Sequence, residues 1–116
     1  MPGRSSSSVR VFYPRWTRES LVKHLRETLP KLAGQLPLAR VVLFGSYASR
    51  RSTVASDIDL LIIYRGPRRE NAYALVRKTL DIPGLEPHIY SLEEAGTVKG
   101  IIQRMERGGV VLLGEG

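Results

Sequence analysis

Two uninterrupted apolar runs constrain the fold of this chain more than any other feature. Residues 41–44 read Val-Val-Leu-Phe and residues 60–63 read Leu-Leu-Ile-Ile, and neither run alternates with polar residues. Strands of this kind are buried on both faces, because an exposed face would carry a polar residue at every second position. The runs predict two buried strands, over residues 40–44 and 57–64, in a sheet covered on both sides.

Amphipathic helical patterns flank these strands in the sequence. The first has Thr17 as its N-cap and is closed by Pro30, Gly34 and Pro37, and its buried face consists of Leu21, Val22, Leu25, Leu29 and Leu32. The second places Ala72, Leu75, Val76 and Leu80 on one stripe. A single last helix is predicted from the capping-box pair Ser91 and Glu94, with Leu92, Ala95, Val98, Ile102 and Met105 on its apolar face.

Further extended segments complete the predicted sheet. Residues 85–90 contain Pro87, which cannot donate to a ladder, so this strand is expected at an edge. Residues 110–113 are a possible final strand, and residues 9–13 a short extra one. The order helix, strand, polar loop, strand, helix, strand, helix, strand indicates an α/β or α+β fold in which helices cover a sheet.

The length of 116 residues and the hydrophobic content of 42% suit one packed core. We expect a partly disordered tail over residues 1–14, which includes four consecutive serines, and a single domain over residues 15–116. The chain has no cysteine, which favours a reducing compartment, and no apolar run long enough to span a bilayer. The expected location is therefore the cytoplasm, without membrane association.

The net charge of +7 suggests polyanionic partners such as nucleotide phosphates, nucleic acid or an acidic protein. Codon bias or thermal adaptation would explain the same balance. The basic residues are scattered rather than clustered, and only scattered aromatic residues accompany them, which argues against nucleic-acid binding. Charge alone does not select a partner.

Two aspartates enter the second apolar run with one residue between them. In a strand, Asp57 and Asp59 would project on the same side, with Cα atoms about 6 to 7 Å apart. Carboxylates at that spacing can share metal ions, and Mg²⁺ prefers oxygen ligands from one or two carboxylates and substrate phosphates. The pair predicts a magnesium site, although Ser56 and Asp57 would also serve to cap an ordinary turn.

A glycine and a serine follow the first apolar run. Gly45 permits an unusual backbone angle or the close approach of a ligand, and Ser46 adds a hydroxyl beside backbone N–H groups that can bind phosphate. A Gly-Ser pair after a strand is also a common turn. The combination is more specific, because strand, Gly-Ser, Asp-x-Asp and strand together would hold a triphosphate beside its metals.

The segment GSYASRRSTVASDIDLLII, residues 45–63, resembles the signature of the polymerase-beta-type nucleotidyltransferases, and the short chain resembles their minimal members. The resemblance implies a nucleotidyltransferase fold, a mixed sheet of about four strands flanked by helices. It also implies that Gly45 and Ser46 bind the nucleotide phosphates and that Asp57 and Asp59 bind two Mg²⁺ ions. In such enzymes a third carboxylate on a later strand completes the site.

Glu86 is the candidate for that third acidic residue, catalytic and metal-binding, but it departs from the aspartate that the family usually has, and Pro87 follows it. A solvated glutamate on an edge strand is the alternative. His88 shares its face by alternation, either as a ligand or substrate contact or as an ordinary half-buried histidine. Arg50 and Arg51 stand where the family has one arginine, and either bind phosphate or belong to a solvated loop.

The resemblance implies an enzyme that transfers a nucleoside monophosphate, with AMP from ATP as the first choice, to an acceptor hydroxyl by in-line attack on the α-phosphate. Minimal nucleotidyltransferases typically act beside a helical HEPN-type protein as a toxin–antitoxin pair, so the expected acceptor is such a partner. The alternative is a catalytically impaired antitoxin that neutralises its partner by direct contact. A domain this small needs a partner or a homo-oligomer for acceptor specificity.

Overall fold

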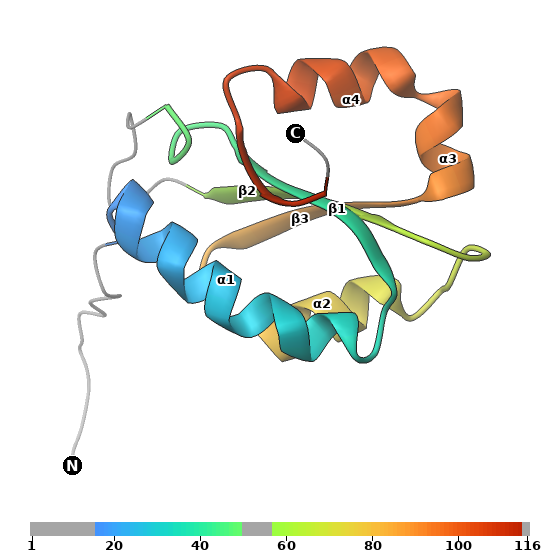
Figure 1. Cartoon of the computed structure of the whole chain (residues 1–116), viewed down its shortest axis with the longest axis horizontal. Helices are drawn as coiled ribbons and strands as arrows, with labels where there is room; N and C mark the ends of the chain where they lie inside the picture. Colours follow the sequence, from blue (N-terminus) through green and yellow to red (C-terminus); the bar gives the residue numbers. More distant parts are fainter. Residues whose placement is uncertain (1–15, 50–56, 115–116) are drawn as a thin grey trace.

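The computed structural model describes residues 16–49 and 57–114, which form a four-stranded mixed sheet with helices on both faces (Figure 1). The strands are β1 (Leu38–Phe44), β2 (Ile58–Tyr64), β3 (Leu85–Ser91) and β4 (Val110–Leu113), in the spatial order β3-β2-β1-β4. β1 runs antiparallel to β2 and β4, whereas β2 and β3 are parallel. The predicted mixed α+β sheet is confirmed.

The two apolar runs occupy the central strands β1 and β2, as predicted. Val41, Val42 and Leu43 of β1 are fully buried, and residues 60–64 of β2 are all buried. β3 lies at an edge of the sheet, where Pro87 is the register partner of Leu60. The absence of an N–H on Pro87 is tolerated there because one side of an edge strand has no neighbour to pair with.

Helices α1 (Arg18–Ala33) and α2 (Ala72–Leu80) cover one face of the sheet (Figure 1). Thr17 caps α1, and its side chain accepts a hydrogen bond of 2.9 Å from the backbone N–H of Ser20. The buried face of α1 consists of Leu21, Leu25, Leu29 and Leu32. These leucines pack with alternate residues of the strands, including Val41, Leu43, Leu60 and Ile62, in the larger of two core clusters.

Pro30 does not close α1, as the sequence pattern had suggested, but lies inside it. The helix continues to Ala33, and the backbone N–H of Gly34 donates to the carbonyl of Pro30 at 3.2 Å. Proline removes one backbone donor from a helix, and α1 continues for only three residues beyond Pro30. Gly34 is therefore the C-cap of the helix.

The last predicted helix is two helices, α3 (Leu92–Thr97) and α4 (Lys99–Glu106), so the expectation of a single helix was wrong. The break lies at Val98, whose φ of −128° and ψ of 39° are not helical. Gly96 and Gly100 flank the break, and glycine and β-branched residues are weaker helix formers than alanine or leucine. The predicted start is confirmed, because Ser91 and Glu94 form a capping box.

Helices α3 and α4 cover the face of the sheet opposite to α1 and α2 (Figure 1). Their smaller core cluster contains Val42, Leu61, Ile63 and Ile102, with Phe44 and Tyr90 packed against it. Alternate residues of each central strand therefore face the two cores in turn. No helix in residues 16–49 or 57–114 is long and apolar enough to cross a membrane. The strand expected at residues 9–13 and the tail over residues 1–14 lie outside the described residues.

Candidate active site

Three side chains form a row across β1, β2 and β3 at one end of the sheet. The register pairs Phe44 with Asp59 and Asp59 with Glu86. Ile58 and Leu60 belong to the core beneath α1 and α2, so Asp59 between them lies on the other face, the one that carries α3 and α4. The row therefore places a carboxylate of the central strand β2 between an aromatic residue and a second carboxylate.

Asp59 is the best-defined member of the row. Its Oδ1 lies 3.4 Å from Nε2 of His88, and the side chains of the two residues are 29% and 36% exposed, respectively. His88 also contacts Phe44, with ring centroids 5.1 Å apart and ring planes tilted by 60°. Asp59 is therefore partly desolvated on one side and open to solvent, and to a ligand, on the other.

Gly45 lies against the second oxygen of Asp59. Its φ of 77° is in the left-handed region, and a Cβ atom built on it would come within 2.4 Å of Asp59 Oδ2. A side chain at this position would therefore clash with the carboxylate and strain the backbone. The glycine and the aspartate, predicted as two halves of one site, are in direct proximity.

The backbone after Gly45 folds into a helical turn. The N–H of Ser49 donates to the carbonyl of Gly45 at 3.1 Å, and the Ser49 hydroxyl donates to the carbonyl of Ser46 at 3.2 Å. At the start of such a turn the first backbone N–H groups have no partner within the turn, which makes them donors for an anion. Ser46 is half-buried in this turn, directly after the glycine that borders Asp59.

Asp57 and Glu86 lie at the margins of the row. β2 begins at Ile58, so Asp57 precedes the strand in which it was predicted, and it is exposed. The N–H of Ile58 donates to the carbonyl of Gly84 at 2.8 Å, which ties this point of the chain to the segment before β3. Glu86, also exposed, is the register partner of Asp59 on the neighbouring parallel strand.

No group of three or more histidine, aspartate or glutamate side chains converges to hold a metal ion among the residues that the structure describes. Mg²⁺ rarely uses an all-protein cage, and it usually binds through one or two carboxylates together with substrate phosphates. The carboxylates and the glycine turn beside Asp59, which a Cβ atom would fill, suit binding of that kind. Arg50 and Arg51 lie outside the described residues.

Phe44 was not predicted as a site residue, although it ends the apolar run just before Gly45. The place of Phe44 in the site can be inferred only when the pairing register of β1 and β2 is known, because that register sets Phe44 opposite Asp59. Alternation along β3 placed His88 on the same face as Glu86, but sequence alone left its role open between a ligand and an ordinary half-buried histidine. The structure gives His88 two neighbours in the site, Asp59 and Phe44.

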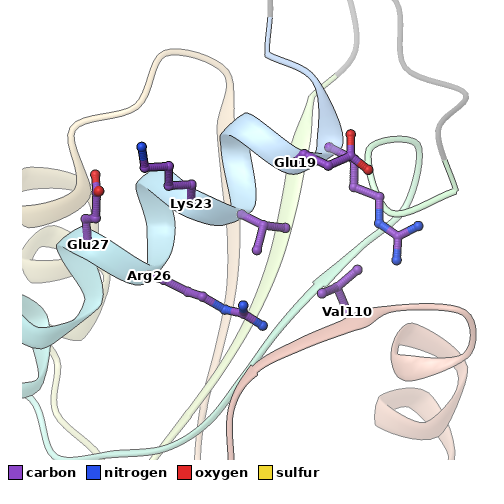
Figure 2. Close-up of a pocket in the computed structure, with 7 residues that line it drawn as sticks. Glu19, Lys23, Arg26, Glu27 and Val110 are labelled. Carbon is purple, nitrogen blue, oxygen red and sulfur yellow. The ribbon is translucent and has the colours of Figure 1, made fainter.

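A hollow of about 490 Å³ lies elsewhere, between α1 and the start of β4. It is lined by Arg18, Glu19, Val22, Lys23, Arg26, Glu27 and Val110. Figure 2 shows Arg26 extending from α1 toward the strand that carries Val110. The lining of this hollow includes none of the predicted site residues that the structure describes. The row around Asp59 is the better candidate for the active site, because it contains the carboxylates and lies beside the glycine turn.

The family model of the nucleotidyltransferase domain matches residues 22–111, a span that reaches from α1 to β4. Among curated proteins, none matches this chain. The matched span includes Gly45, Ser46, Asp57, Asp59 and Glu86.

Solved structures share the fold. A protein from Sulfolobus solfataricus assigned to the nucleotidyltransferases superimposes with a TM-score of 0.56 at 21% identity, covering 81% of this chain and 80% of its own. A toxin–antitoxin complex with AMP-PNP gives a TM-score of 0.52 at 26% identity, over 86% of this chain and 75% of that one. A mutant of the toxin–antitoxin pair MntA-HpeT gives 0.50 at 24% identity, again over 86% and 75%.

Proposed function

The chain belongs to the nucleotidyltransferase domain family, and from this premise we propose that it transfers AMP from ATP to an acceptor hydroxyl on a HEPN-type toxin partner. The observation that carries the proposal is the contact between the two halves of the site. Gly45 approaches Asp59 so closely that no side chain fits between them. A phosphate bound at the turn after Gly45 would therefore lie beside the carboxylate that holds its metal.

Each site residue has a proposed role. Gly45 and Ser46 bind the triphosphate through the turn, Arg50 and Arg51 neutralise its charge, and Asp57, Asp59 and Glu86 hold two Mg²⁺ ions. Bound divalent ions at such a site supply charge neutralisation for the attacking and leaving oxygens. Glu86 is next to Asp59 in the sheet. We propose that Glu86 accepts the proton of the acceptor hydroxyl as this hydroxyl attacks the α-phosphate and pyrophosphate leaves.

The acceptor is proposed to be a protein. A related solved structure, 26% identical, is a toxin–antitoxin complex with AMP-PNP, which supports both an adenine nucleotide and a toxin as partners. We place the reaction in the cytoplasm, where ATP and Mg²⁺ are both supplied.

The test is metal-dependent labelling of the partner. The chain is co-expressed with a HEPN-type protein, and added AMP is measured by intact-mass spectrometry and with radiolabelled ATP. We expect Asp57→Asn and Asp59→Asn to lower the initial rate of labelling by about 100-fold or more, because each removes a negative ligand from the site. Circular dichroism should show an unchanged fold.

Asp81→Asn is the matched control. Asp81 is exposed and caps α2 in the left-handed conformation, with a φ of 46°, which asparagine also adopts readily. It should label the partner at the wild-type rate. A near wild-type rate in either Asp57→Asn or Asp59→Asn would show that the site is assigned wrongly.

The second candidate function is neutralisation by contact alone. It is favoured by the exposure of Glu86 and by the lack of a three-ligand cluster among the described residues. Growth of cells that express the toxin separates the two functions. Rescue by the Asp59→Asn variant, with no AMP on the toxin, supports contact, whereas loss of rescue supports catalysis.

A further inference from the structure

His88 fills the space between Phe44 and Asp59 on the face of the sheet that carries the site. We propose that His88 is a positioning residue that fixes the orientation of the Asp59 carboxylate for the Mg²⁺–nucleotide complex. The inference rests on the function proposed above, since it assigns a role to one more residue of the same site.

The two oxygens of Asp59 have different surroundings. Oδ1 lies 3.4 Å from His88 Nε2, whereas Oδ2 lies against Gly45, the residue at which the turn begins. A carboxylate only accepts hydrogen bonds, so the histidine nitrogen is the donor. A hydrogen bond to Oδ1 therefore holds the side chain so that Oδ2 points to the turn, where the triphosphate is proposed to bind.

The ring of Phe44 holds His88 in place. The two ring centroids are 5.1 Å apart, in the tilted arrangement that aromatic pairs favour. Phe44 is itself fixed, because it is the register partner of Asp59 and packs against the core beneath α3 and α4. His88, Phe44 and Asp59 thus come from three adjacent strands of the sheet.

The distance of 3.4 Å is long for an N–H···O hydrogen bond. Hydrogen bonds of unliganded active sites are often long and shorten when the ligand binds. Carboxylates that ligate metals are commonly hydrogen-bonded by neighbouring groups, and the loss of such a group costs about 10- to 100-fold in metal affinity or activity. His88 has the position of such a group.

Two substitutions of His88 distinguish the effect of its hydrogen-bond donor from the effect of its aromatic ring. His88→Phe keeps an aromatic ring against Phe44 but has no donor, whereas His88→Gln places an amide N–H near the position of Nε2 and has no ring. Binding of α,β-methylene-ATP, whose transferable bond cannot be cleaved, is measured by calorimetry with Mg²⁺ and with EDTA. Transfer to the partner is measured in parallel to separate KM from kcat.

We expect His88→Phe to weaken Mg²⁺-dependent binding by about 10-fold and to leave binding in EDTA unchanged, because its effect passes through a metal ligand. His88→Gln should bind within about 3-fold of the wild type. Wild-type binding by His88→Phe, or equal loss in both variants, would overturn the proposal. Equal weakening in EDTA would show instead that His88 touches the nucleotide directly, which also overturns it.

A second measurement requires no ligand and so stands apart from the proposed function. Urea unfolding of His88→Phe, Asp59→Ala and the double variant gives the coupling between the two side chains. We expect a coupling factor of about two in the unfolding equilibrium constant, the lower end of the contribution of one hydrogen bond, because this bond is long without a ligand. Additive effects would overturn the proposal even if the wild type binds Mg²⁺–nucleotide, whereas coupling without any such binding would contradict the proposed function alone.

Discussion

The two halves of the candidate site, the turn that begins at Gly45 and the carboxylate of Asp59, can lie side by side because Gly45 has no side chain. Its backbone adopts a φ of 77°, and the space where a Cβ atom would lie is taken by the Asp59 carboxylate. The backbone angle and the lack of space for a Cβ atom both arise where the chain leaves β1 and turns past the charged side chain of Asp59. Gly45 therefore controls the distance between the turn proposed to bind phosphate and the carboxylate proposed to bind metal.

We expect Gly45→Ala to destabilise the fold by about 1–3 kcal/mol and to abolish binding of Mg²⁺–nucleotide. The Cβ atom would come within 2.4 Å of Asp59 Oδ2 and displace the carboxylate. Gly66→Ala is the matched control, because Gly66 has a φ of 91° but nothing within 4 Å of its would-be Cβ atom. Urea unfolding and calorimetry measure the two effects.

The control should lose about 1 kcal/mol for its backbone strain and keep its affinity for nucleotide. The two variants then share the backbone strain and differ in the contact with Asp59. If Gly45→Ala bound Mg²⁺–nucleotide as tightly as Gly66→Ala does, the close approach of Gly45 to Asp59 would have no role in the site.

The sequence named the central residues of the candidate site but did not predict their arrangement. Gly45 and Asp59 were predicted from the combination of a Gly-Ser pair and an Asp-x-Asp pair between two apolar runs. The contact of His88 with Asp59 depends on the register of β2 and β3, and no local pattern specifies a register between parallel strands joined by a helix. Roles that depend on contacts across strands therefore required the structure.

At the scale of elements, Ser91 links the end of β3 to the start of α3. It is fully buried, pairs in register with Tyr64, and is the N-cap of α3. Its hydroxyl accepts from the N–H of Glu94 at 3.1 Å, and its own N–H donates to Glu94 Oε1 at 2.9 Å. The direction in which the chain leaves the sheet is therefore fixed by one capping box.

We expect Ser91→Ala to cost about 1–2 kcal/mol, because the N–H of Glu94 loses its partner in a half-buried position. Thr17→Ala removes the same type of cap from α1 at an exposed position, where water replaces the lost acceptor, and should cost less. Urea unfolding of the two variants compares them directly. An equal or smaller loss for Ser91→Ala would mean that burial adds nothing to this cap.

The elements themselves were largely predictable. Unalternated apolar runs predicted β1 and β2, and apolar residues at three- and four-residue steps predicted α1 and α2. The signals for β3 and β4 were weaker, because β3 contains Pro87 and β4 has only four residues. The break between α3 and α4 was missed because the apolar residues keep a helical spacing through Val98, whereas the backbone of Val98 is not helical. Pro30 was read as a stop although one missing hydrogen bond in the last turn is tolerated.

At the scale of the whole molecule, one sheet supports two cores. The larger core lies beneath α1 and α2 and the smaller beneath α3 and α4. Both are built from alternate residues of the same central strands, for example Leu60 on one side and Leu61 on the other. The site occupies the face of the smaller core, so its geometry depends on a sheet that the larger core stabilises.

This shared sheet predicts that the two cores unfold together. Leu61→Ala, on the face opposite to α1, should cost about 2–5 kcal/mol. Trp16, the single tryptophan, packs against the larger core, and its ring centroid lies 5.1 Å from that of His24. Its fluorescence therefore reports on the core on the other side of the sheet from Leu61. In Leu61→Ala, the urea midpoints from Trp16 fluorescence and from circular dichroism should fall equally. The control is Ile101→Ala, at an exposed position of α4, which should leave both midpoints unchanged. A fluorescence midpoint that stayed at the wild-type value would show instead that the two cores unfold separately.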